Sequence, residues 1–245
     1  MNSAASSVTQ SVRQFEVDAF ARPTAVGHEL TLPPVAQIAP VVFVVDDDVS
    51  VRESLELLIR CEGWQPRTFA SALEFLDCRR TIGPSCLILD YCLPDLNGLE
   101  LQKRVAIERP DMPIIFITGR HDVPMTVQAM KAGAFEFLTK PFLDDVLLKA
   151  IRDGLDRSRA AVRQQADMQQ LRERYASLSC RERQVMALVA SGLLNKQVGG
   201  ELGISEITVK AHRGKVMQKM QADSLADLVR MATRLRIPHA PVFQA

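Results

Sequence analysis

Short, mostly apolar runs alternate with helical periodicities across residues 41–157. The runs are four or five residues long and rich in β-branched and aromatic side chains, which is typical of strands buried inside a sheet. They predict strands at 41–45, 65–69, 86–90, 113–117 and 135–138. Apolar residues spaced by three and four predict helices at 50–61, 71–79, 98–108, 124–132 and 142–157. This alternation predicts an α/β domain of five βα units around a parallel sheet.

The pattern changes after residue 157. The last predicted helix continues past the domain, with Arg, Gln, Asp and Ala between its apolar residues. These recur at intervals of three, four or seven, first at Leu148, Ile151, Leu155 and Val162 and later at Met168, Leu171 and Tyr175. Such a segment is either a solvated helical linker or a weak dimerising coiled coil, and the polar residues that interrupt the apolar seam favour the linker.

Residues 177–240 predict a small all-α domain of four helices. Helix starts and a tight turn are marked by a capping box at Ser179 and Glu182, by Asn195 and Ser205 as caps, and by Gly203 in the turn. A last helix is predicted at about 224–235. The second and third helices, joined through Gly203, predict a helix-turn-helix.

Residues 1–40 are rich in Ser, Ala and Pro and predict a disordered N-terminal extension. No apolar stretch approaches the ~20 residues that span a bilayer, and the first residues do not resemble a secretory signal. The 5 cysteines show no metal-ligand spacing. These observations predict no membrane association and a cytoplasmic protein in a reducing compartment.

The net charge of +1 is the sum over regions of opposite charge, an acidic one and a basic one. Residues 41–145 hold 11 basic and 17 acidic side chains, whereas residues 177–245 hold 10 basic and 5 acidic ones. An acidic domain followed by a basic one indicates that the second, not the first, contacts nucleic acid.

Chemically active side chains stand where the predicted strands end. Asp46 and Asp47 follow the first strand, Asp90 ends the third, Thr118 follows the fourth, and Lys140 follows the fifth. Ligands of open α/β sheets bind beyond the carboxyl ends of the strands. Oxygen ligands without His or Cys suit Mg²⁺, and a carboxylate such as Asp90 can act as a nucleophile in aspartyl-phosphate chemistry. Lys140 and the Thr118 hydroxyl would stabilise the transferred phosphoryl group.

The motifs VVDDD (44–48), LILDYCLPDLNGLEL (87–101), IFITGR (115–120) and FLTKPF (137–142) together resemble the flavodoxin-like receiver domain of two-component response regulators. The run at 121–134 resembles the NarL/FixJ type. The resemblance covers residues 41–145. Together with the alternation of strands and helices it predicts a receiver domain over 41–157, which the helical linker over 158–176 follows.

The same resemblance assigns roles within the receiver. Asp90 would be the phosphoacceptor, Asp47 a direct Mg²⁺ ligand assisted by Asp46, and the backbone carbonyl of Cys92 a further ligand. Thr118 and Phe137 would form the switch pair, in which Thr118 moves toward the phosphoryl group and Phe137 fills the vacated space. The Lys140–Pro141 bond would be cis.

A helical wheel over residues 205–221 places Val209, Val216 and Met220 on one face. The opposite face has small residues in its middle and consists of Ile207, Ala211, Gly214 and Gln218. The stretch 178–220 resembles the LuxR-type helix-turn-helix, which implies that Lys210, Ala211 and Gly214 read bases. The residues expected to contact or support the DNA backbone are Thr208, His212, Lys215 and Lys219.

The sequence therefore predicts a phosphorylation-activated transcriptional regulator, by resemblance an activator, and not an enzyme. The implied partners are a sensor histidine kinase, promoter DNA, RNA polymerase and, on phosphorylation, a second copy of the chain. One rival is a DNA-binding protein with a degenerate receiver, against which the complete set of pocket residues argues. The other is a phosphatase of the haloacid kind, which would need a second Asp at the position of Cys92.

Overall fold

The computed structural model of the protein describes residues 39–119 and 123–237. The predicted extension, residues 1–40, lies outside these ranges except for its last two residues. The strands are β1 (Val41–Val45), β2 (Gln65–Phe69), β3 (Ser85–Asp90), β4 (Ile114–Thr118) and β5 (Glu136–Thr139). The helices are α1 (Val49–Cys61), α2 (Ala72–Asp77), α3 (Gly98–Glu108), α4 (Val123–Lys131), α5 (Asp144–Ala176), α6 (Cys180–Ala190), α7 (Asn195–Leu202), α8 (Glu206–Met220) and α9 (Leu225–Arg234).

The five strands form one parallel sheet in the order β2-β1-β3-β4-β5, as the alternation of strands and helices predicts. The register pairs Val45 of β1 with Leu89 of β3, and Thr118 of β4 with Thr139 of β5. The carboxyl ends of these strands therefore meet along one edge of the sheet, which is the geometry that brings residues far apart in sequence together.

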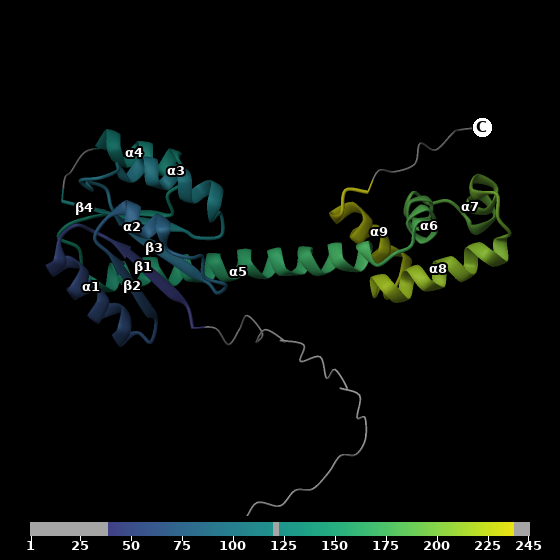
Figure 1. Ribbon diagram of the computed structural model, residues 1–245, viewed down its shortest axis with the longest axis horizontal. Coiled ribbons are helices and arrows are strands. Elements are labelled where there is room, and N and C mark those ends of the chain that lie inside the picture. The colour runs from purple at the N-terminus through teal and green to yellow at the C-terminus, as the bar shows by residue number, and fades with distance from the viewer. Residues whose placement is uncertain (1–38, 120–122, 238–245) are drawn as a thin grey trace, which may run out of the picture. The chain divides into compact units, whose positions relative to one another are not determined.

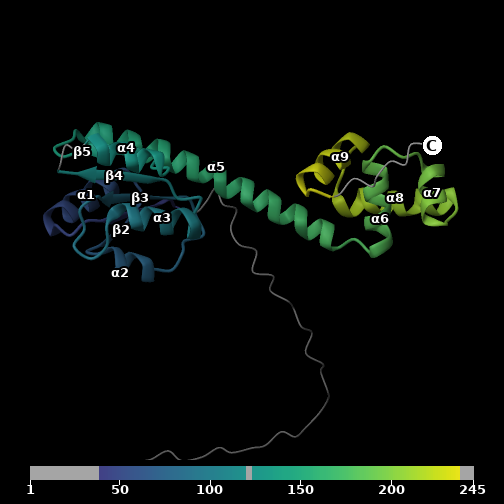
Figure 2. The ribbon, with the colours of Figure 1, turned by 90° about the horizontal axis from the view of Figure 1, so that it is seen from above.

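Helices cover both faces of the sheet (Figure 1 and, turned by 90°, Figure 2). Alternate residues of β1 point to opposite sides: Val41, Phe43 and Val45 pack with residues of α2, α3 and α4, whereas Val42 and Val44 pack with α1 and α5. Both sets are fully or almost fully buried. The two-sided burial explains why the central strands β1, β3 and β4 are mostly continuous apolar runs, whereas the edge strands β2 and β5 are partly exposed.

Each predicted strand and helix of the receiver is present, with ends that differ by at most two residues, except that α5 continues to Ala176. The segment predicted as a helical linker is thus part of this helix. The predicted linker segment packs against other parts of the chain near both of its ends. The Ser158 hydroxyl accepts a hydrogen bond from the Ser85 amide at 3.0 Å, and Leu171 is buried in the apolar cluster of the C-terminal helices.

The C-terminal helices α6 to α9 enclose their own apolar cluster. The capping box at Ser179 and Glu182 is present, Gly203 is left-handed with φ 64°, and Ser205 caps α8. The prediction that Asn195 caps α7 is wrong. Leu194 occupies the N-cap, and its N–H donates to the Gln197 side chain at 2.8 Å, while Asn195 accepts from Arg213.

Two adjacent glycines of α7 have different structural roles. A Cβ on Gly199 would lie 2.7 Å from the carbonyl oxygen of Ile204, because the turn passes close over this residue. A Cβ on Gly200 would meet nothing within 4 Å. Gly199 is therefore required by the turn, whereas Gly200 carries only the low helix propensity of glycine.

We expect the variants Gly199→Ala and Gly200→Ala to change stability in opposite directions. Gly199→Ala should lower the free energy of unfolding by about 1–3 kcal/mol, as overpacking does. Gly200→Ala should raise it by up to ~1 kcal/mol through helix propensity. Urea denaturation of both variants measures these changes, and an equal effect of the two would contradict the role assigned to the turn.

Candidate phosphorylation site and nucleic-acid interface

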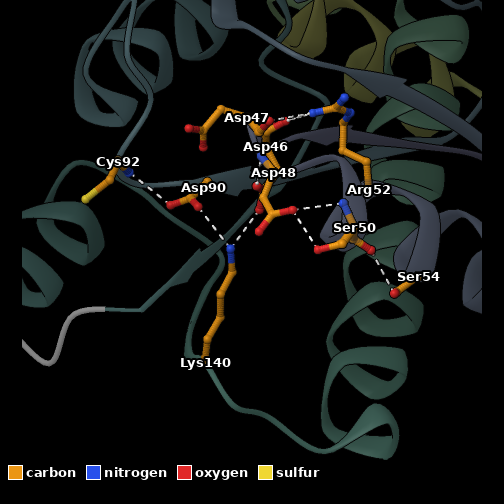
Figure 3. A network of polar contacts seen from close by, with 9 residues as sticks. All are labelled: Asp46, Asp47, Asp48, Ser50, Arg52, Ser54, Asp90, Cys92 and Lys140. Carbon is orange, nitrogen blue, oxygen red and sulfur yellow. Dashed lines mark hydrogen bonds and ion pairs between the residues drawn. The ribbon is translucent and has the colours of Figure 1, made fainter.

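The acidic residues converge at the carboxyl edge of the sheet (Figure 3). Asp46 follows β1 and is fully buried, Asp47 beside it is exposed, and Asp90 at the end of β3 is nearly buried. One carboxylate oxygen from each of the three lies within 4.8 Å of the other two. Sequence reasoning placed these residues at strand ends, and the parallel register brings them together.

Lys140 connects two of these carboxylates. Its Nζ lies 2.7 Å from Asp46 Oδ2 and 2.9 Å from Asp90 Oδ2, as Figure 3 shows. Its backbone N–H donates to the Thr118 carbonyl at 2.7 Å, and the bond to Pro141 is cis, as predicted. Lys140 thereby links the end of β4 to the carboxylates of Asp46 and Asp90.

Burial and the contacts of Lys140 change the pKa values of Asp46 and of Lys140 itself. Burial raises the pKa of the Asp46 carboxyl above its ordinary value, although hydrogen bonds from Lys140 and from the Asp48 N–H oppose the rise. Burial alone would lower the pKa of the Lys140 ammonium, but its bonds to Asp46 and Asp90 outweigh that effect and raise this pKa. The lysine is therefore held in its charged form between two acids.

The set of donor atoms fits a hard divalent cation. Three carboxylates supply oxygen ligands of the kind that Mg²⁺ prefers, and close like charges favour a cation among them. Cys92 enters the site through its backbone: its N–H donates to Asp90 Oδ1 at 2.9 Å. The expectation that its carbonyl binds the metal stays a prediction.

Several residues that support the pocket were not identified from the sequence. The Arg52 guanidinium donates to the carbonyl oxygens of Asp46 and Asp47 at 2.7 and 2.9 Å. Asp95 accepts from the N–H groups at the start of α2, which fixes the loop after β3. A Cβ on Gly98 would lie 3.1 and 3.2 Å from the carbonyl oxygens of Tyr91 and Asp90. The glycine therefore lets α3 begin close against this loop.

The two predicted switch residues stand at the ends of neighbouring strands. Thr118 is buried at the end of β4, and Phe137 is half-buried on β5. The Phe137 ring lies 6.2 Å from that of Phe116, which in turn lies 5.7 Å from Tyr91, between ring centroids. An aromatic row thus runs from Phe137 back to the residue after Asp90.

The helix α8 has one buried and one exposed face, as the helical wheel predicts. Val209, Val216 and Met220 are buried in the C-terminal cluster. Six of the seven residues predicted to read bases or to contact or support the DNA backbone are exposed, and they are Thr208, Lys210, Ala211, Gly214, Lys215 and Lys219. His212 is half-buried, so it belongs fully to neither face.

Two of the predicted DNA-contacting lysines are engaged within the protein. Lys210 pairs with Glu206 one turn earlier, at 3.1 Å on the exposed surface. Lys219 lies 2.7 Å from the buried carboxylate of Glu182 and 3.3 Å from the Ser177 carbonyl. Lys219 therefore ties the end of α8 to the start of α6, a contact between helices that sequence spacing does not show.

Glu182 should make this module sensitive to acid. The hydrogen bond from Lys219, followed by that from the Ser179 N–H, lowers the pKa of Glu182 from 4.5 to about 2. Because the folded-state pKa is lower than the unfolded one, the stabilisation is complete above pH 4.5 and is lost as the pH falls toward 2.

We expect Glu182→Gln to destabilise the chain at neutral pH and to do so less as the pH falls below about 4.5, near the unfolded glutamate pKa. Urea denaturation across that pH range measures the difference. Glu201→Gln, at an exposed position of α7, is the matched control and should show no such trend. A stability difference for Glu182→Gln that stays constant with pH would contradict the assignment.

Comparison with known proteins gives matches over both parts of the chain. Residues 42–152 match the response regulator receiver domain, and residues 176–232 match the bacterial regulatory proteins of the luxR family. Nodulation protein W of Bradyrhizobium diazoefficiens is 50% identical over 202 residues, which cover 82% of this chain and 89% of that protein. The transcriptional regulatory protein FixJ of the same organism is 42% identical over 193 residues, covering 79% and 94%.

A solved structure shows the same similarity. The response regulator StyR is 49% identical and superimposes with a TM-score of 0.72, covering 80% of this chain and 100% of that one. The relatives extend over both the receiver and the helix-turn-helix. The chain therefore belongs to the two-component response regulators of the NarL/FixJ type, in which a receiver domain is joined to a LuxR-type DNA-binding domain.

Proposed function

We propose that this response regulator accepts a phosphoryl group on Asp90 from a sensor histidine kinase and then regulates transcription from promoter DNA. The observation that carries the proposal is the pocket in Figure 3, where Asp90 shares one ammonium with Asp46. A nucleophilic carboxylate beside a fixed cation is suited to receive a phosphoryl group, because the cation also stabilises the charge of the product.

Mg²⁺ is the proposed cofactor, and when bound it neutralises the phosphoryl oxygens. Asp46, Asp47, Asp90 and the carbonyl of Cys92 would hold it. The chain's own residues do the remaining work. Lys140 stabilises the charge on the acyl phosphate, and the Thr118 hydroxyl donates a hydrogen bond to it.

The rival function as a phosphatase is disfavoured at one position. Hydrolysis of a phosphomonoester by an aspartyl nucleophile would use a second carboxylate two residues after Asp90, and Cys92 stands there with an exposed side chain. We therefore propose that the protein is a substrate of phosphoryl transfer, not a turnover enzyme.

Phosphorylation would control transcription by rearranging the switch pair, Thr118 and Phe137. We propose that Thr118 moves toward the phosphoryl group, that Phe137 follows, and that the surface around α4 and β5 then favours a homodimer. Two DNA-binding modules in one dimer bind with raised effective concentration. The protein would act in the cytoplasm, where promoter DNA lies, as an activator that contacts RNA polymerase.

Within the DNA-binding module, we propose Lys210, Ala211 and Gly214 as base-reading positions, with Thr208 and Lys215 as contacts to the DNA backbone. Small residues at 211 and 214 let the helix lie deep in the major groove. Lys219 acts as a support of α8, because its ammonium is already bound to Glu182.

Asp90→Asn should abolish phosphoryl transfer from acetyl phosphate or a kinase, because it keeps the shape of the side chain and removes the nucleophile. Phosphate-affinity gels or mass spectrometry of the purified chain measure the transfer. Asp77→Asn, at an exposed position of α2, is the control and should be phosphorylated as in the wild type. A stable phosphoryl adduct on the Asp90→Asn variant would show that another carboxylate is the acceptor.

The salt dependence of DNA binding should distinguish Lys215 from Lys219, two of the three lysines of α8. Lys215→Ala should lower the slope of log affinity against log salt by about one, since one phosphate contact is lost. Lys219→Ala should weaken binding without changing the slope, because it releases α8 from α6 instead. Gel shifts at several salt concentrations measure both slopes, and a lower slope for Lys219→Ala would make it a phosphate contact after all.

Activation should change the oligomeric state of the full chain. Sedimentation with and without beryllofluoride should show a dimer only with the phosphoryl mimic. A chain that stays monomeric and nevertheless gains DNA affinity would exclude dimerisation as the switch.

A further inference from the structure

Ile207 is an apolar side chain in an unusual place. It is 80% exposed, more than any other large apolar residue described in the C-terminal module. Single exposed apolar residues are common on protein surfaces and usually need no explanation. Ile207, however, is the second residue of α8, in the first turn after the cap Ser205, and α8 is the helix of the helix-turn-helix that would enter DNA.

The residues below Ile207 on the same face are also apolar or small. Ala211, one turn along, and Gly214, two turns along, are both exposed, and a Cβ on Gly214 would meet nothing within 4 Å. The opposite face is buried through Val209 and Val216. Ile207, Ala211 and Gly214 thus form a row without polar side chains, which we call the apolar row.

Charged groups border the apolar row without filling it. Lys210 and Glu206 pair with each other at 3.1 Å, and Lys215 is exposed one position beyond Gly214. Positive charge beside the row suits the phosphates that flank a groove. The partner that fits the whole face is therefore a DNA major groove with an apolar feature at its floor, rather than an apolar protein surface.

Only one base offers that feature. Thymine presents a C5-methyl group beside its O4 acceptor in the major groove, whereas the other three bases present hydrogen-bonding atoms and no methyl group there. Ile207 cannot satisfy a donor or acceptor, so a cytosine or guanine facing it would lose its water without gaining a partner. The N-terminal residues of such recognition helices are the ones that contact base edges.

We propose that Ile207 is a specificity-determining residue that contacts the methyl group of a thymine in each half of the DNA site. This inference rests on the proposed DNA-binding function and deepens it by naming a base that the site must contain. Burying one methyl-sized group corresponds to about a fourfold change in affinity.

The test begins with the activated full chain and two pools of random duplex DNA, one with thymine and one with uracil in its place. Uracil lacks only the methyl group. The preferred duplex from the thymine pool is then altered one base at a time, from thymine to uracil and from cytosine to 5-methylcytosine. Affinities are measured for the wild type, Ile207→Ser and Ile207→Val, and for Ile107→Ser as a matched control at an 82% exposed position of α3.

We expect one position in each half-site where uracil weakens binding about fourfold for the wild type, Ile207→Val and Ile107→Ser, and not for Ile207→Ser. At that position, 5-methylcytosine should bind better than cytosine only where residue 207 is Ile or Val. A uracil penalty that is equal in Ile207→Ser, or absent at every position, would overturn the inference and leave DNA binding intact. A wild type that selects no sequence from either pool would overturn the proposed function together with it.

Discussion

The ion pairs of Lys140 are the interaction on which the receiver site depends. Asp46 is wholly buried, and Asp90 stands close beside it, so two carboxylates would otherwise repel each other where water cannot screen them. The ammonium at 2.7 and 2.9 Å compensates both. Removing one partner of such a group would leave an uncompensated buried charge, which is strongly destabilising. The parallel sheet supplies this arrangement, because its carboxyl edge collects residues from β1, β3 and β5.

The same lysine explains how a chemical event in the pocket could reach the rest of the receiver. A phosphoryl group on Asp90 would compete with Asp46 for the ammonium. The backbone N–H of Lys140 donates to the carbonyl of Thr118, the last residue of β4. The same strand carries Phe116, the middle ring of the aromatic row from Phe137 to Tyr91. A change in the partners of this cation would therefore act on a residue whose backbone is hydrogen-bonded to the end of β4.

Much of the fold and the acidic site could be predicted from the sequence, because both depend on local patterns. Buried parallel strands are continuous apolar runs, and the residues after them must share an edge of the sheet. This is why Asp46, Asp90 and Lys140 were identified. The supporting contacts of Arg52 and Asp95, and the pairing of Lys219 with Glu182, join elements distant in sequence and leave no spacing to recognise. Asn195 shows the opposite error, in which a local pattern predicts a contact that does not form. Its side chain suits an N-cap, but Leu194 occupies that position, and the Leu194 N–H donates to the Gln197 side chain.

The central claim is that the state of the acidic pocket controls DNA binding. Its most direct test is the DNA affinity of the full chain, measured on one selected duplex with and without acetyl phosphate and Mg²⁺, for the wild type and for Asp90→Asn. The account predicts that the phosphodonor raises the affinity of the wild type and leaves that of the variant unchanged. An equal affinity of the wild type in both conditions, or an equal gain in the variant, would contradict it.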